Sequence, residues 1–277
     1  MMKIYIPFSI LLTSFVSLQS SAQYYYKDIL SNEEGVTNIA AYKANKVKVI
    51  SIKSLEFDGS ESEGFYCQKK FSKDYKTSTL FTKSDFTGAS EMKASYNAEG
   101  KLIRSSDSST IAVSRVSYTY APNGMPQTIT TVLSSSDDDF TNELSEQHIY
   151  AYNEKQNPTK MLLIKNKKDT TIIFFSEDEN GNVGIEKNAT TGNKFYYYYN
   201  TRQQLTDIVL TSENRKGLHP EYLFEYSNNQ LNQMTVTQEG GSNFLIWKYA
   251  YDNGMRVREK CYGKDRKLMG SIVYEYK

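Results

Sequence analysis

The chain has 277 residues, of which 33 are basic and 32 acidic, so its formal net charge at pH 7 is only +1. A chain without a strong net charge is a poor candidate for binding nucleic acid or an anionic membrane surface. Its 23 Tyr and 13 Phe favour strands over helices, because aromatic side chains fit a pleated, half-buried surface. The composition therefore predicts an all-β protein with no nucleic-acid partner.

Residues 1–22 predict a cleaved secretory signal peptide. Lys3 supplies the positive charge, Ile4 to Leu18 form an interrupted apolar stretch, and Ser20-Ser21-Ala22 precede Gln23. The apolar stretch is shorter than the roughly 20 residues that a membrane span needs, so we expect no membrane span after cleavage. Without Lys3 the mature chain carries 32 basic and 32 acidic residues. We expect an exported protein, located in the periplasm, at the cell surface or outside the cell.

The next two segments lead into the main array. Residues 23–44 read as a polar lead-in. Residues 45–89 show period-2 alternation, beginning at Val47 and Val49, and predict N-terminal strands that form a possible cap of the array. No segment after the signal shows sustained apolar spacing of three and four residues, so the sequence predicts no helix in the mature chain.

Residues 90–277 contain a segment that recurs about every 25 residues and ends on a tyrosine. The anchors of this repeat are Tyr96, Tyr120, Tyr152, Tyr199, Tyr226, Tyr251 and Tyr276, with a degenerate copy near Glu177. Each anchor closes an alternating run and precedes a turn, and Asn-Gly turns such as Asn253-Gly254 are strong hairpin signals. Each repeat is therefore predicted to be one β-hairpin.

The predicted hairpins and N-terminal strands together give about 19 strands. Open sheets of more than about ten strands curl, split or pack on themselves. The predicted fold is an extended antiparallel meander of β-hairpin repeats, forming a curled open sheet or half-barrel.

The repeat resembles the YD, or RHS-type, repeat of secreted bacterial proteins. The copies that carry the resemblance are Phe224 to Leu231, Tyr249 to Met255 and Ser95 to Leu102. Only Tyr251-Asp252 has the namesake dipeptide at an anchor. The resemblance covers about residues 90–277 and implies a β-sheet scaffold with carbohydrate-binding or shell roles, but no particular activity.

The two cysteines, Cys67 and Cys261, lie 194 residues apart near opposite ends of the array. A disulfide requires α-carbons within about 7 Å, so a bond would require the sheet to curl until its ends meet. The alternative is two separate buried thiols, which we favour.

The sequence offers little catalytic chemistry. His148 shares a strand face with Tyr150 and Tyr152, and His219 precedes Pro220 in a predicted loop. Neither has the spacing of a metal site or of a nucleophile–base pair. We therefore expect no enzyme activity, no metal and no cofactor. A hydrolase would need carboxylates gathered around His148 by the fold.

The aromatic ladder is the one candidate binding surface. Its residues either pack against one another across strands or form a platform for sugar rings, and Trp247 is the first residue to test. The ladder consists of Tyr120, Tyr152, Tyr199, Tyr226, Trp247 and Tyr251.

Three functional hypotheses follow. The first is an exported, non-enzymatic scaffold or binding protein of the bacterial envelope, whose partner is a glycan or an envelope protein. The second is an outer-membrane β-barrel, although the mean hydropathy of −0.60 is low for that class. The third is an uncharacterised hydrolase. The oligomeric state stays open.

Overall fold

The computed structural model describes residues 24–136, 143–212, 215–238 and 243–277. The predicted signal peptide, residues 1–22, lies outside the described residues.

The described chain consists of one helix followed by strands. The helix is α1 (Lys27–Ala44), and the strands are β1 (Val49–Glu56), β2 (Tyr66–Phe71), β3 (Thr77–Ser84), β4 (Gly88–Tyr96), β5 (Leu102–Ser109), β6 (Ala112–Tyr120), β7 (Pro126–Ser135), β8 (Glu143–Tyr152), β9 (Pro158–Lys165), β10 (Asp169–Glu177), β11 (Val183–Asn188), β12 (Lys194–Tyr199), β13 (Leu205–Ser212), β14 (Arg215–Ser227), β15 (Gln230–Thr237), β16 (Phe244–Asp252), β17 (Met255–Tyr262) and β18 (Leu268–Tyr276).

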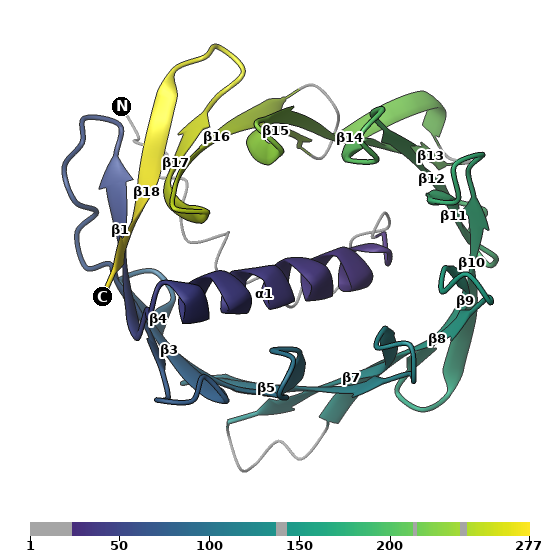
Figure 1. Ribbon diagram of the computed structural model, residues 1–277, viewed down its shortest axis with the longest axis horizontal. Coiled ribbons are helices and arrows are strands. Elements are labelled where there is room, and N and C mark those ends of the chain that lie inside the picture. Colours follow the sequence, from purple (N-terminus) through teal and green to yellow (C-terminus); the bar gives the residue numbers. More distant parts are fainter. Residues whose placement is uncertain (1–23, 137–142, 213–214, 239–242) are drawn as a thin grey trace.

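The strands form one closed antiparallel barrel. Each strand pairs with the next along the chain, and β1 also pairs with β18, from Ile50 opposite Tyr276 to Glu56 opposite Gly270. Figure 1 shows the resulting ring, with the yellow C-terminal strand beside the dark blue β1. The all-β, antiparallel prediction is confirmed.

The predicted open sheet or half-barrel is wrong, because the sheet closes fully. Closure gives every strand two neighbours and removes the exposed edges that an open sheet would present to other chains. The alternation that predicts each hairpin is the same in an open sheet and in a barrel, so the local pattern could not distinguish them. A closed barrel is the shape that the outer-membrane hypothesis required.

Residues 45–89 contribute β1 to β3 and the start of β4 to the same sheet. Because β1 also pairs with β18, these strands complete the ring. The capping role of residues 45–89 stays a prediction.

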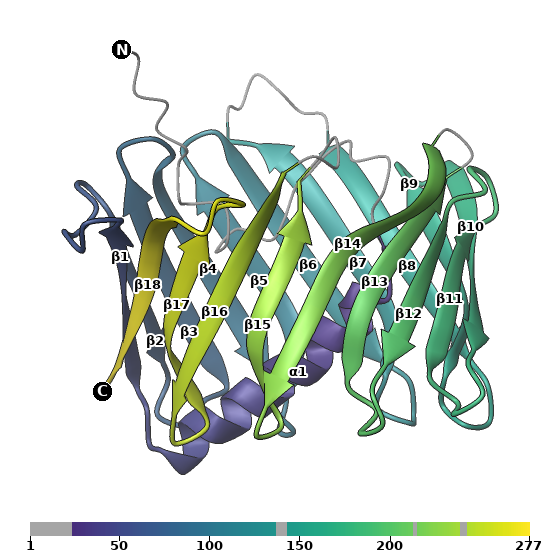
Figure 2. The same cartoon turned by 90° about the horizontal axis from the view of Figure 1, so that it is seen from above.

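Helix α1 lies inside the barrel, crossing the lumen obliquely (Figures 1 and 2). The prediction of no helix in the mature chain is wrong. Helix α1 buries only two apolar side chains, Ile29 and Ile39, so it lacks the apolar stripe by which an amphipathic helix is recognised. Most of the polar residues between Glu33 and Asn38 are exposed, so this side of the helix faces solvent in the lumen.

The apolar core therefore lies between the helix and the inner face of the wall. Its largest cluster joins Tyr25 and Ile29 to inward side chains such as Met161, Ile173 and Ile208, which are fully buried. A second cluster surrounds Ile39 at the β1–β3 side. No helix in the described part of the chain is long and apolar enough to cross a membrane.

Five of the seven anchor tyrosines, at the ends of even-numbered strands, make the same kind of hydrogen bond. Alternation places the anchor ring on the inner face, as for Tyr199 two residues after the buried Tyr197, and the register with the next strand shifts between Tyr198 and Tyr199. The hydroxyl then donates to a carbonyl at the start of the previous return strand. This bond joins Tyr120 to Leu102, Tyr152 to Pro126, Tyr199 to Val183, Tyr226 to Leu205 and Tyr276 to Arg256.

Candidate functional site

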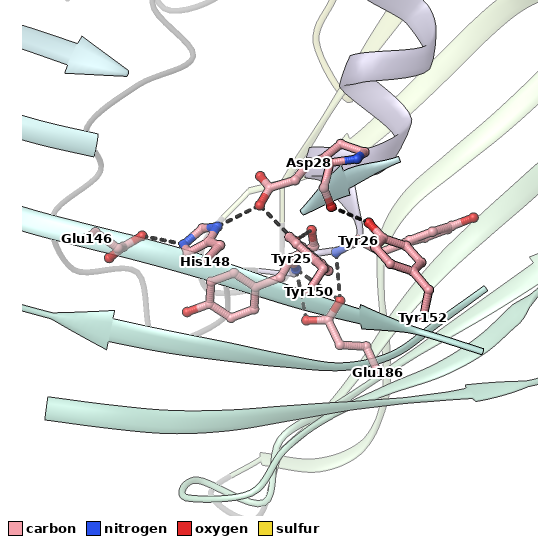
Figure 3. Close-up of polar contacts among 9 residues, drawn as sticks. Tyr25, Tyr26, Asp28, Glu146, His148, Tyr150, Tyr152 and Glu186 are labelled. Carbon is pink, nitrogen blue, oxygen red and sulfur yellow. Dashed lines mark hydrogen bonds and ion pairs between the residues drawn. The ribbon is translucent and has the colours of Figure 1, made fainter. Parts of the chain in front are cut away.

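The strongest concentration of buried polar groups lies where α1 begins (Figure 3). Glu186, on β11, is only 2% exposed. Its carboxylate accepts hydrogen bonds of 2.9 Å from the backbone N–H groups of Tyr25 and Tyr26, and one of 2.8 Å from the Tyr197 hydroxyl. The first N–H groups of a helix lack partners within it and carry its positive dipole end. Glu186 therefore supplies from the wall the cap that α1 does not provide itself.

The second group of the network is centred on His148. Its Nδ1 lies 2.6 Å from Asp28 in the first turn of α1, and its Nε2 lies 2.9 Å from Glu146 on its own strand, β8. The Tyr150 hydroxyl donates to the same Asp28 oxygen over 2.8 Å. Strand alternation places Glu146, His148 and Tyr150 on one face, and α1 brings Asp28 to them.

The environment sets the charge of this network. Burial opposes a charge on His148, but its hydrogen bonds to Asp28 and Glu146 outweigh burial and raise its pKa to about 9. The hydrogen bond from His148 lowers the pKa of Glu146. Burial raises the pKa of Glu186 to about 7, against the lowering effect of its three donors. At neutral pH His148 is therefore an imidazolium held between two carboxylates.

This arrangement suits anchoring better than catalysis. A general base must have a free lone pair near the operating pH, whereas both ring nitrogens of His148 carry protons directed at carboxylates. Carboxylates do gather around His148, as the hydrolase hypothesis requires. They bond to both ring nitrogens, however, and through Asp28 they hold the start of α1 against the wall. Among the described residues, no group of His, Cys, Asp and Glu has the arrangement of a metal site.

A second ion-pair cluster holds the middle of α1. Arg256, on β17, pairs with the buried Glu259 over 3.1 Å and with Glu34 of α1 over 3.4 Å. The Arg256 guanidinium also lies 4.4 Å from the Tyr249 ring centroid, and the Tyr274 hydroxyl donates to Glu259 over 2.6 Å. The helix is thus fixed at two points to opposite parts of the wall (Figure 1).

The aromatic ladder is present, but it faces the lumen. Trp247 is 4% exposed and packs with Tyr249 and Cys261. Tyr120, Tyr152, Tyr199, Tyr226 and Tyr251 are half-buried on the same inner face. Ladder residues stack within single strands, as Tyr120 does on Tyr118 and Tyr152 on Tyr150. Their binding of sugars stays a prediction.

The cysteines are both buried with free thiols. The sheet does bring its ends together, but β1 and β18 separate Cys67 on β2 from Cys261 on β17. Three strand spacings of about 4.8 Å exceed the reach of a disulfide.

From the sequence, only His148 stands out among the polar residues that hold α1. Asp28 and Glu34 lie in a segment read as a polar lead-in, and Glu186 and Arg256 look like ordinary strand and turn charges. A weak signal was available: Glu186 occupies an inward position of its strand, where a charge needs a partner.

Comparison with known proteins adds little. No family model and no curated protein matches the sequence. The chain is similar to the crystal structure of a porin-like protein from Bacteroides uniformis, at 11% identity, a TM-score of 0.29, and coverage of 83% of this chain and 96% of that one. It is also similar to the TcdB2-TccC3 crystal structure, at 12% identity, a TM-score of 0.28, and coverage of 84% and 17%. The Photorhabdus luminescens Tc holotoxin pore gives 12% identity, a TM-score of 0.28, and coverage of 85% and 17%.

These likenesses carry no argument about function at such TM-scores, and the chain spans only 17% of the toxin chains. The predicted YD-repeat resemblance finds support in the β-rich fold alone. The strand pairings by themselves establish the closed barrel.

Proposed function

We propose that this chain is an exported, non-enzymatic β-barrel of the bacterial envelope whose lumen is occupied by its own helix. The observation that carries the proposal is the placement of α1 inside the ring of strands, fixed by Asp28 and Glu186 at its start and by Arg256 at Glu34. The helix crosses the lumen and is fixed at both of these points, so it narrows the passage through the barrel. Functional contacts are then made by the outer wall and the loops.

The charged side chains of the outer wall indicate that water surrounds much of the barrel. Charged side chains point outward at mid-strand on β1 to β6 and β16 to β17. They include Lys53, Lys70, Lys93, Arg104, Arg115, Lys248 and Arg258. Each Lys or Arg facing lipid at the midplane costs about 2–4 kcal/mol. A complete lipid-facing belt would therefore be strongly unfavourable for this wall.

The second candidate is the outer-membrane barrel, favoured by closure and by one sector of the wall. On β8 to β14 a group of outward positions is apolar, beside charged ones such as Lys160, Lys187 and Asp207. The apolar group is Ile149, Leu162, Ile172, Phe174, Ile185, Tyr196, Tyr198 and Leu223. Phe174, Tyr198 and Leu223 are 45%, 48% and 37% exposed. This sector suits a membrane or protein contact on one side of the barrel.

Cell fractionation distinguishes the two candidates. The chain, expressed with its native N-terminus in a Gram-negative host, is expected in the soluble periplasmic fraction without detergent. Retention in the outer membrane after an alkaline carbonate wash, with extraction only by detergent, would support the second candidate and overturn the first.

A further inference from the structure

The outer face of β3 to β7 contains a hollow of about 750 Å³. Its outward lining consists of two cross-strand rows of side chains. One row runs Thr79, Lys93, Ser106, Arg115, Val132, and the other runs Thr77, Ser95, Arg104, Ser117, Thr130. We call this surface the basic groove.

The cations of the basic groove stand among short side chains. Lys93, Arg104 and Arg115 come from three consecutive strands, and all three are exposed. Their outward neighbours are mostly Ser and Thr, so the long basic side chains rise above a floor of hydroxyl groups. The groove is therefore both positively charged and rich in hydrogen-bonding groups.

The positive charge of the groove is largely uncompensated. Arg104 and Arg115 bond only to the hydroxyls of Ser95 and Ser134, over 3.4 and 3.2 Å, and neither forms an ion pair within the described residues. Lys93 pairs with Glu91 over 2.8 Å, but its side chain is 69% exposed. The other carboxylate on these strands, Asp107, belongs to the inner face, opposite Met92 and Ser114.

The distances between the three basic side chains suit polyanions whose charges repeat at a similar distance. Lys93 and Arg115 share a row two strands apart, about 10 Å, and Arg104 lies diagonally between them at about 7–8 Å from each. Two strand spacings match the length of one disaccharide in an extended polysaccharide. A chain with one acidic group per disaccharide can thus meet both ends of the row while its hydroxyls contact Ser and Thr.

We propose that the basic groove binds an acidic polysaccharide. Single-stranded nucleic acid fits less well, because such sites stack bases on aromatic rings and none of the residues lining the groove is aromatic. A lipid surface fits less well, because the site is a hollow, into which a flat bilayer surface does not fit. This inference rests on the proposed location of this part of the wall in water.

The test measures binding of hyaluronan, which carries one carboxylate per disaccharide, to the soluble protein at low and moderate salt. In the groove variant, Lys93, Arg104 and Arg115 are replaced by Gln. In the control variant, Lys248→Gln, Arg258→Gln and Lys260→Gln remove the same charge from β16 and β17. We expect the groove variant to lose about tenfold or more in affinity, the control to stay within about twofold, and salt to weaken wild-type binding.

Four results would overturn the inference: no binding by wild type, an equal loss in the control, equal binding of neutral dextran, or tighter binding of oligothymidylate than of hyaluronan. Circular dichroism and urea unfolding establish that both variants fold. The measurement uses detergent-free protein, so a chain that requires detergent contradicts the proposed location before any binding is tested.

Discussion

At the scale of single residues, the anchor tyrosine explains why the repeat ends on this residue type. Its ring fills the lumen face, and its hydroxyl satisfies a carbonyl of the preceding hairpin. Phenylalanine would supply the ring alone. Where it is present, the bond therefore links a hairpin to its neighbour in addition to the ordinary ladder of strand pairing.

Replacing Tyr199 by Phe tests this role. The change leaves the Val183 carbonyl without its 2.9 Å donor and removes the interaction of the hydroxyl with Tyr26. We expect a loss of about 1–3 kcal/mol in the free energy of unfolding, measured by urea titration. The matched control is the adjacent Tyr198→Phe, whose ring faces outward and is 48% exposed. Equal effects of the two changes would show that the anchor hydroxyl has no special role.

The His148 network predicts a pH dependence of stability. The folded-state pKa of His148 is raised from 6.5 to about 9, so its contribution is fully present below pH 6.5 and is lost as the pH rises through 9. The raised pKa corresponds to about 3 kcal/mol. The pKa of Glu186 is also raised, from 4.5 to about 7. Because the folded state then holds this proton more tightly, the free energy of unfolding falls as the pH rises from about 4.5 to about 7.

We therefore expect the free energy of unfolding to decrease between pH 6.5 and 9.5. His148→Gln should cost about 3 kcal/mol at pH 6.5, because it removes the buried cation that pairs with Asp28, and should flatten the decrease. Lys160→Gln, which removes a positive charge from the outer face of the neighbouring strand β9, serves as the control and should change neither property. An unchanged slope in His148→Gln would refute the assigned role of the network.

At the scale of elements, the hairpins were predictable and the helix was not. Alternating runs that end in Asn, Asp or Gly specify strand and turn locally, as in Tyr249 to Gly254. Helix α1 depends on partners supplied by β8, β11 and β17, which are far away in sequence. Its own residues lack an apolar stripe, and tertiary contacts determine its conformation.

Gly100 tests the packing of α1 against the wall. Its φ is +84°, and a Cβ placed there would lie 3.0 Å from Ile39 Cγ2 of the helix. Gly100→Ala should therefore cost the strain of a left-handed residue, about 1 kcal/mol, plus the cost of displacing Ile39. Gly181 has the same φ with open space around it, so Gly181→Ala measures the strain alone.

Urea unfolding of both variants gives the difference between them. We expect Gly100→Ala to be the less stable, and the added change Ile39→Ala to remove most of the difference in a double-mutant cycle. Indistinguishable stabilities of the two alanine variants would mean that α1 does not pack on this turn in solution.

At the scale of the whole molecule, closure decides what each face of the sheet can do. It encloses the aromatic ladder and the ion pairs around α1, and it leaves charged and apolar sectors on the outside. The inward and outward faces were predictable from alternation, whereas closure was not, because it depends on the accumulated twist and stagger of the whole sheet. The candidate site was predictable only at His148.

The seam between β1 and β18 provides the most direct test of the closed barrel. Ser51 and Glu275 are opposite one another across this seam, and their outward side chains are close enough for a short bifunctional thiol reagent. The measurement is bimane fluorescence of the Ser51→Cys, Glu275→Cys variant after reaction with dibromobimane, on the monomer fraction with its mass verified. Ser51→Cys with Gln147→Cys on β8 is the control. The closed barrel predicts a fluorescent intramolecular crosslink in the seam variant alone. Its absence from folded monomer would contradict closure and, with it, the enclosed helix.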